Sequence, residues 1–169
     1  MSNDTSFDPR AFRRALGCFP TGVAIITTRD AQGRPVGLTC NSFSSVSLDP
    51  PLVLWSLRTE SRLMEAFRGN LAFAINVLAE DQGALSARFA NSAIEHKFEG
   101  VAHSWGHGGA PLINGAVARF HCSQYALQEA GDHVVFIGRV ERFEQPRPEG
   151  ALVYYKGAYA MLGPVPAAA

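Results

Sequence analysis

The chain has 169 residues, of which 47% are apolar and 18% charged, a composition typical of one globular domain rather than a disordered segment. Its 15 basic residues balance 15 acidic ones, so net charge gives no bulk attraction to nucleic acid or an anionic membrane. No apolar run approaches the roughly 20 residues of a membrane span, and the polar N-terminus is unlike a secretory leader. We therefore expect a cytoplasmic protein with one domain over residues 1–169, its core at about 10–162, and neither nucleic-acid nor membrane partners.

The predicted elements begin with a helix at residues 8–17, because Asp8 followed by Pro9 is a typical helix start and Gly17 can end the helix. Short apolar or β-branched runs then predict strands at residues 23–28, 36–41, 43–48 and 52–57. The pattern continues with a helix at 61–67, a strand at 71–78, a helix at 81–89 and a Gly-rich loop at 100–111. Later strands are expected at 117–128, 133–143 and 151–155, followed by a frayed tail at 164–169.

This order of elements defines the expected fold class. Seven or eight strands at short spacing and three short helices show no β-α-β alternation, and no G-x-G-x-x-G follows a strand. The pattern therefore excludes a dinucleotide-binding α/β fold and favours a mainly β protein, built as a closed or nearly closed antiparallel barrel.

Cysteines and histidines give little sign of a metal site. Cys18, Cys40 and Cys122 are odd in number and far apart, which argues against a disulfide framework or structural zinc. His103 and His107 share the Gly-rich segment, where a solvated loop is favoured over a metal site because no third ligand lies nearby in the sequence. We predict no metal site.

One polar segment stands out between two apolar strands. This segment is residues 37–47, which begins at Gly37 and carries six hydroxyl or amide side chains in the nine residues 39–47. Such groups at a bend can hydrogen-bond the edge of a heteroaromatic ring or a phosphate. They can equally form a serine-rich turn that hydrogen-bonds only itself, and composition alone favours this second interpretation.

Three motifs in register give the chain a resemblance to a known family. Residues 12–23 read F-R-R-A-L-G-C-F-P-T-G-V, residues 39–53 read T-C-N-S-F-S-S-V-S-L-D-P-P-L-V, and residues 131–133 read G-D-H before a strand. Ala74–Leu78 and Lys97-Phe98 match as well, so the similarity runs over residues 10–162. Together these motifs resemble the flavin reductase-like family.

The resemblance implies an FMN-binding split barrel, usually a homodimer with flavin near the subunit interface. It also implies an NAD(P)H:flavin oxidoreductase that uses NADH or NADPH to reduce FMN or FAD. Members of this family are reductase components of two-component monooxygenases, so the expected partner is a flavin-dependent oxygenase reached by diffusible reduced flavin. Hydride transfer needs proximity and stacking rather than a side-chain acid or base, which agrees with the lack of a nucleophile triad in the sequence.

The same resemblance assigns roles to particular residues. Contacts to the flavin ring and ribityl chain are implied for Thr39, Cys40, Asn41, Ser42, Phe43, Ser45 and Val46. The flavin phosphate end is implied for Glu60, Ser61 and Arg62, and closure over the flavin for Phe89, Lys97 and Phe98. Nicotinamide is assigned to His133, the one candidate catalytic residue, and NADH contact to Tyr159. Cys40 is read as a small packing residue rather than a redox group.

Alternatives remain at this level. A cap serine and a solvated arginine explain Ser61 and Arg62 without a ligand, and both phenylalanines can be purely structural. Two other proteins of similar architecture are a pyridoxamine-phosphate oxidase-like enzyme, which should carry a more basic phosphate clamp, and a non-catalytic flavin- or haem-binding module. The motif at residues 131–133 argues against the second, because a pure binder has no use for nicotinamide.

Overall fold

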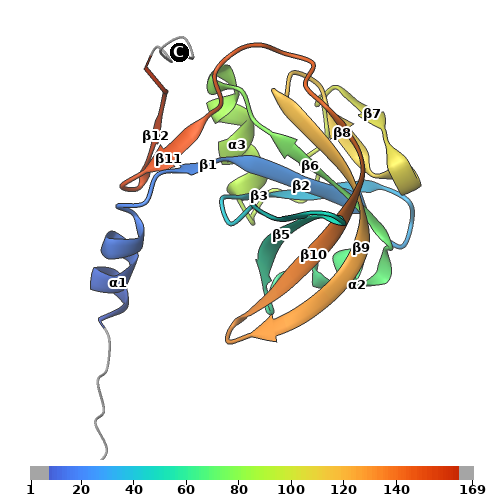
Figure 1. Cartoon of the computed structure of the whole chain (residues 1–169), viewed down its shortest axis with the longest axis horizontal. Helices are drawn as coiled ribbons and strands as arrows, with labels where there is room; N and C mark the ends of the chain where they lie inside the picture. Colours follow the sequence, from blue (N-terminus) through green and yellow to red (C-terminus); the bar gives the residue numbers. More distant parts are fainter. Residues whose placement is uncertain (1–7, 164–169) are drawn as a thin grey trace, which may run out of the picture.

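The computed structural model describes residues 8–163, and its centre is a seven-stranded antiparallel sheet in the order β3-β2-β6-β9-β10-β5-β4. The strands of this sheet are β2 (Ala24–Arg29), β3 (Pro35–Cys40), β4 (Ser44–Leu48), β5 (Pro51–Arg58), β6 (Ala72–Val77), β9 (Ala118–Ala130) and β10 (His133–Glu144). The sheet curls round a common core (Figure 1), which confirms the predicted mainly β split-barrel class.

Smaller elements complete the molecule. Two further sheets contain β1 (Thr21–Gly22), β11 (Val153–Tyr155) and β12 (Ala158–Ala160), and β7 (His103–Trp105) with β8 (Pro111–Ile113). The α-helices are α1 (Pro9–Leu16), α2 (Met64–Gly69) and α3 (Gly83–Ala90), and two 3-10 turns are η1 (Glu80–Gln82) and η2 (His107–Gly109). No helix in residues 8–163 is long and apolar enough to cross a membrane.

The predicted elements differ from the structure in several places, and β12 (Ala158–Ala160) is one that the sequence did not predict. The helix expected from residue 61 begins at Met64, and Ser61 instead forms a turn in which its Oγ accepts the Leu63 N–H at 3.2 Å. The predicted loop at 100–111 is wrong in part, since β7 and η2 lie there; Gly108 and Gly109, with φ of 59° and 74°, let the chain turn back into β8. Residues 1–7 and the tail at 164–169, expected to fray, lie outside the described residues.

The barrel interior is aromatic. Along β5 the buried side chains alternate, so that Val53, Trp55 and Leu57 all face the core. The Trp55 ring stacks on Phe136 at 4.6 Å and meets the edge of Phe67 at 4.8 Å. Because Phe67 comes from α2, this short helix closes one end of the barrel beside the turn that follows β5.

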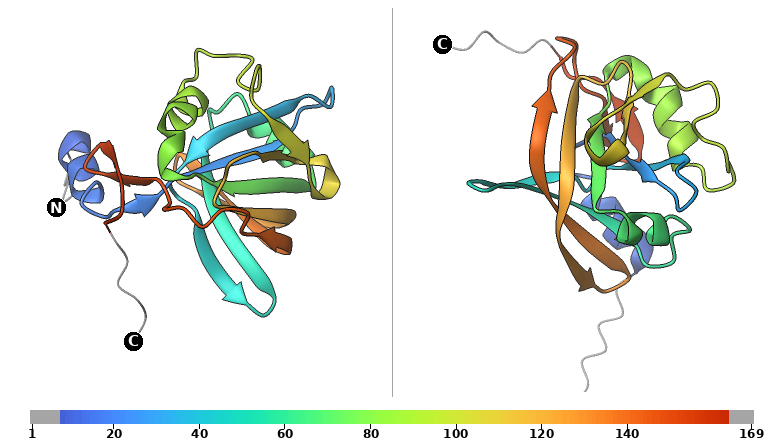
Figure 2. Two further views of the ribbon diagram at one scale, coloured as in Figure 1. Left: turned by 90° about the horizontal axis from the view of Figure 1, so that it is seen from above. Right: turned by 90° about the vertical axis from the view of Figure 1, so that its right-hand side faces the viewer.

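A projecting arm stands away from the barrel. It consists of α1 and the β1-β11-β12 sheet, which lie to one side of the curled sheet in Figure 1 and in the left view of Figure 2. Asp8 caps α1 by accepting the Arg10 N–H at 2.9 Å, as the sequence predicts, yet no residue of α1 is buried. Phe12, Leu16 and Phe19 of this arm are more than half exposed.

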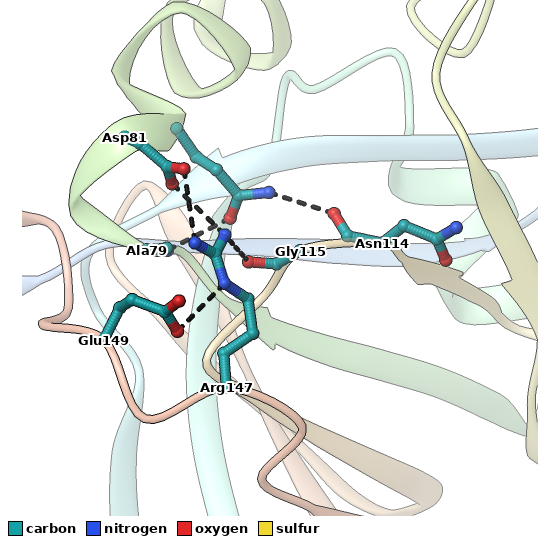
Figure 3. A network of polar contacts seen from close by, with 7 residues as sticks. Ala79, Asp81, Asn114, Gly115, Arg147 and Glu149 are labelled. Carbon is teal, nitrogen blue, oxygen red and sulfur yellow. Dashed lines mark hydrogen bonds and ion pairs between the residues drawn. The ribbon is translucent and has the colours of Figure 1, made fainter.

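An arginine network anchors the segment between β10 and the arm (Figure 3). Arg147 donates from Nε to Glu149 at 3.0 Å, from Nη1 to the Gly115 carbonyl at 3.0 Å, and to both Asp81 oxygens at 3.3 Å. Gln82 donates to the Asn114 carbonyl and accepts the Ala79 N–H, each at 3.0 Å. The network thus ties three loops together at the base of α3.

Candidate active site

A cavity of about 800 Å³ opens where the barrel is split between β3 and β5. Within residues 8–163, β3 pairs only with β2, and β4 pairs with β5 only as far as Leu54. Residues 35–40 and 56–58 therefore line the cavity with strand edges that lack a neighbouring strand. Backbone N–H and C=O groups on such edges are ready hydrogen-bond partners for a ligand.

A hydrogen bond through the Ser42 hydroxyl joins the two sides of the split at one end. The Ser42 hydroxyl accepts the Ser56 N–H at 2.9 Å, and the Cys40 Sγ lies 3.0 Å from the same hydroxyl. Cys40 also accepts the Ser42 N–H at 3.3 Å, and burial raises the pKa of its thiol. A protonated, hydrogen-bonded thiol suits packing at the cavity wall, as the sequence suggested, and not redox chemistry.

Thr39 and Asn41 supply further polar groups on this wall. The Thr39 hydroxyl donates to the Ser86 carbonyl on α3 at 2.6 Å, so its proton is committed and the oxygen can only accept from a ligand. Asn41 is exposed at the cavity mouth. Together they offer acceptors and donors within the segment that the sequence singled out.

Charged side chains of both signs line the cavity, with Arg58, Arg62 and Lys97 beside Glu60 and Glu95. Lys97 is half-buried, its Nζ donates to the Phe89 carbonyl at 2.6 Å, and burial lowers the pKa of its ammonium. Among the described residues no carboxylate pairs with it, whereas Arg58 faces Glu60 at 3.8 Å. Arg62 lies exposed on the same cavity. A half-buried ammonium without a counter-ion is well placed to bind an anion such as a phosphate.

His133, at the start of β10, lines a third side of the cavity. Its Nδ1 lies 2.7 Å from the Asp132 carboxylate, and this hydrogen bond, with the charge it brings, holds the pKa of Asp132 below its usual range. The backbone of Asp132 is fixed because its carbonyl accepts the Thr59 N–H at 3.0 Å. With Nδ1 engaged, Nε2 is the ring nitrogen that can face a ligand in the cavity.

Most of the predicted site residues come together here. The cavity is lined by eleven of them: Thr39, Cys40, Asn41, Ser42, Glu60, Ser61, Arg62, Phe89, Lys97, Phe98 and His133. Phe89 and Phe98 pack edge to face at 5.0 Å. Both rings are almost fully buried, so they line the cavity and also belong to the hydrophobic core behind it.

Four predicted contacts lie outside this cavity in the single chain. Phe43 turns inward and packs on Phe120 at 5.6 Å. Ser45 and Val46 are exposed on the β4–β5 hairpin, which projects from the barrel in Figure 2, at an irregular step in the strand pairing. Tyr159 donates to the Ser86 hydroxyl on α3 at 2.8 Å. Their roles toward flavin or NADH stay predictions.

Several lining residues were not singled out from the sequence. Gly37 is one, and a Cβ there would come within 2.8 Å of the Ile26 carbonyl and 3.3 Å of Phe89. Ser56, Arg58 and Glu95 are others. Ser56 and Arg58 could have been suspected, since Ser56 lies within the predicted strand at 52–57 and Arg58 directly follows it. Glu95 carries no local signal.

A split antiparallel barrel with a polar strand-edge cavity, an unpaired lysine and an oriented histidine defines the class of flavin-handling split-barrel proteins. Within that class, the family model described as "Flavin reductase like domain" matches residues 16–163. The chain belongs to this family.

Several proteins similar to this chain carry the names of flavin reductases. A "Probable flavin reductase" of Rhizobium meliloti is 48% identical over 153 residues, which cover 90% of this chain and 49% of that protein. The chain thus spans about half the length of this relative. The reductase subunit HsaB of a flavin-dependent monooxygenase from Rhodococcus jostii is 42% identical, with 94% of this chain and 80% of HsaB covered. The structure of Streptomyces globisporus NADH:FAD oxidoreductase SgcE6, in complex with NAD and FAD fragments, matches with a TM-score of 0.87 and 35% identity, covering 93% and 94% of the two chains.

Proposed function

We propose that this chain is an NAD(P)H:flavin oxidoreductase that transfers hydride from NADH or NADPH to FMN or FAD and supplies reduced flavin to a separate monooxygenase. The observation that carries the proposal is the cavity itself, in which two free strand edges face an unpaired half-buried ammonium and an oriented histidine. The names of relatives, a monooxygenase reductase subunit and an NADH:FAD oxidoreductase, support the same activity.

The residues present fit a flavin. Its ring edge alternates hydrogen-bond donors and acceptors, which the edge of β3 and the side chains of Thr39 and Asn41 can match. Lys97 supplies the charge that its phosphate requires, and Arg62 and Ser61 lie on the same cavity. A bound flavin supplies the hydride acceptor. The few exposed cations fit a flavin held loosely enough to be released.

His133 has the geometry to position the nicotinamide. The hydrogen bond from Nδ1 to Asp132 favours an orientation in which Nε2 is left for a ligand at the cavity rim. Hydride transfer requires the two rings to be close and parallel, and no proton has to be moved by a side chain in that step. His133 therefore affects the rate through placement of the nicotinamide and should not be essential to the chemistry.

We also propose a cytoplasmic homodimer of a single-domain chain. The arm carries exposed apolar side chains on both of its parts, Phe12 and Leu16 on α1 and Tyr154 and Met161 on the β1-β11-β12 side. A strongly amphipathic helix with no buried residue has an apolar face that a second copy can cover. Size exclusion should give about twice 18.2 kDa, and a fully active monomer would contradict this assembly.

The function is tested by steady-state oxidation of NADH and of NADPH, each with FMN, with FAD and without added flavin. We expect rapid turnover that depends on added flavin and falls in His133→Ala, while His107→Ala serves as the matched control because His107 lies outside the cavity and bonds Ser123. If neither nicotinamide supports turnover with either flavin, the reductase proposal fails and a non-catalytic binding module is the better account.

A further inference from the structure

The hydroxyl of Tyr159 ties the projecting arm to the helix α3. It donates to the Ser86 hydroxyl at 2.8 Å, and a Cβ on Gly83, three residues earlier in α3, would lie 3.8 Å from the Tyr159 ring. Neither Tyr159 nor Ser86 lines the cavity between β3 and β5. α3 stands between the arm and the curled sheet in the left view of Figure 2, so this contact holds the helix from the side of the arm.

On its other side, α3 holds two residues of the cavity through backbone carbonyls. The Ser86 carbonyl accepts the Thr39 hydroxyl at 2.6 Å, and the Phe89 carbonyl accepts the Lys97 ammonium at 2.6 Å. Thr39 belongs to β3 and Lys97 to the loop after α3, so these bonds reach two separate segments that line the cavity. The position of one short helix therefore determines where the acceptor oxygen of Thr39 lies relative to the positive charge of Lys97.

The packing of α3 on β3 leaves little room for adjustment. A Cβ at Gly37 would come within 2.8 Å of the Ile26 carbonyl and 3.3 Å of the Phe89 ring, because the helix approaches the strand so closely. Phe89 is fully buried and packs on Phe98 at 5.0 Å. In a closely packed interior a displaced helix moves its neighbours with it, so a shift of α3 would change the cavity wall.

The two partners of the Tyr159 contact differ in exposure. Ser86 is fully buried, whereas Tyr159 is 42% exposed. Removal of the tyrosine hydroxyl would leave a buried serine hydroxyl without its donor, which is unfavourable. Removal of the serine hydroxyl instead leaves a tyrosine that can bond to water. Either change releases α3 from the arm, but only the first leaves a buried polar group unpaired.

We propose that Tyr159 is a positioning residue for flavin binding: through Ser86 it holds α3 in place and thereby sets the separation of Thr39 and Lys97 across the cavity. This role rests on the proposed flavin reductase function and deepens it, because flavin affinity then depends on a residue of the arm that lies outside the cavity. It differs from the role that the motif resemblance implies, in which Tyr159 contacts NADH directly.

The first test is direct binding of FMN, measured by fluorescence titration without nicotinamide. Wild type, Tyr159→Phe, Ser86→Ala and the double variant are compared. Each single variant should raise the FMN dissociation constant by roughly 2- to 30-fold, the range found for residues that act on a site through packed neighbours. The double variant should bind FMN no more weakly than the weaker single variant, because both substitutions remove the same contact. Effects that add in the double variant would overturn the route through Ser86.

Steady-state kinetics distinguish positioning of the flavin from a contact with NADH. In both single variants the KM for FMN should rise, whereas kcat at saturating FMN and the KM for NADH should stay close to those of the wild type. A rise in the KM for NADH in Tyr159→Phe alone, with unchanged FMN binding, would overturn the proposal in favour of a direct contact.

Tyr155→Phe is the matched control. Tyr155 lies on β11 of the same arm, is 38% exposed, and has no hydrogen-bond partner for its hydroxyl among residues 8–163, so its variant should bind FMN as the wild type does. Urea unfolding checks that each variant is folded, and Ser86→Ala keeps the test decisive if Tyr159→Phe is unstable.

The proposal and the function on which it rests can fail separately. Unchanged FMN dissociation constants in folded Tyr159→Phe and Ser86→Ala would overturn the positioning role alone. Wild-type protein that binds FMN but oxidises neither NADH nor NADPH would contradict the reductase function, and the FMN dissociation constants would still decide the role of Tyr159. Wild-type protein without measurable affinity for FMN or FAD would contradict both.

Discussion

Replacing Lys97 by methionine should separate ligand binding from folding. The substitution keeps a long unbranched side chain and removes only the ammonium, which is half-buried and donates to the Phe89 carbonyl at 2.6 Å. Phe89 lies in the last turn of α3, so the ammonium also faces the negative end of that helix. In the ligand-free protein these favourable contacts oppose the free-energy cost of burying the charge. That burial is also what lowers the pKa of Lys97.

The two sides of this balance are of similar size. A hydrogen bond from a charged group contributes about 1.5–3 kcal/mol, and partial burial of an ammonium costs a comparable amount, so the unfolding free energy of Lys97→Met without flavin should change by less than about 1 kcal/mol. Binding has no such compensation. Loss of a charge-assisted hydrogen bond to a phosphate, about 1.5–3 kcal/mol, should raise the FMN dissociation constant by roughly 10- to 150-fold.

Fluorescence titration with FMN and urea unfolding measure the two effects on the same samples. Lys97→Arg keeps the positive charge and should retain most of the affinity for FMN. The matched control is Lys156→Met, which removes the other lysine of the sequence, at an exposed position on the arm. Wild-type affinity should also fall as pH rises toward the lowered pKa of Lys97, because binding an anion favours the protonated amine. Unchanged FMN affinity in Lys97→Met would refute the assignment of the phosphate to this wall.

Three further predictions concern the described fold. Only Cys18 should react rapidly with a thiol reagent in the native protein, because burial raises the pKa of Cys122 to about 12 and also raises that of Cys40; native labelling of Cys122 detected by mass spectrometry would contradict this. Gly138→Ala should lower stability by about 1–3 kcal/mol in urea, since the new methyl group collides with the Phe73 ring, whereas Gly69→Ala meets nothing within 4 Å and should differ little from wild type. Arg147→Gln should lower the melting temperature by a few degrees and speed proteolysis near residues 145–150, and an unchanged digestion pattern would show that the network in Figure 3 does not hold this segment.

The sequence predicted those features whose signals are local. Runs of β-branched residues located the main strands, and Asp8-Pro9 located α1 to the residue. The three-residue strands β7 and β12 were missed because so short a segment contains too little alternation to distinguish it from a loop. The site was anticipated mainly through motif resemblance, and the side to which each chain segment turns was not: Phe43 points into the core although its neighbour Ser42 lines the cavity.

The sequence could not predict which segments far apart in the chain lie side by side in the fold. Glu95 and His103 line a cavity together with residues of the β2–β3 hairpin, about 60 residues earlier in the chain, only because the loop after α3 folds back against that hairpin. The tie between Tyr159 and Ser86 depends likewise on the docking of β12 near α3. No periodicity within either segment contains this information, because it resides in the packing of the two segments on each other.

The free edge of β3 has a consequence for the protein in concentrated solution. An uncovered strand edge is a template for another chain, and residues 35–40 present such an edge at the mouth of the barrel. A ligand seated along it would occupy the same backbone groups that an intruding strand needs. Saturating flavin should therefore slow aggregation. Preparations stripped of flavin should lose soluble protein faster during storage than preparations that retain flavin.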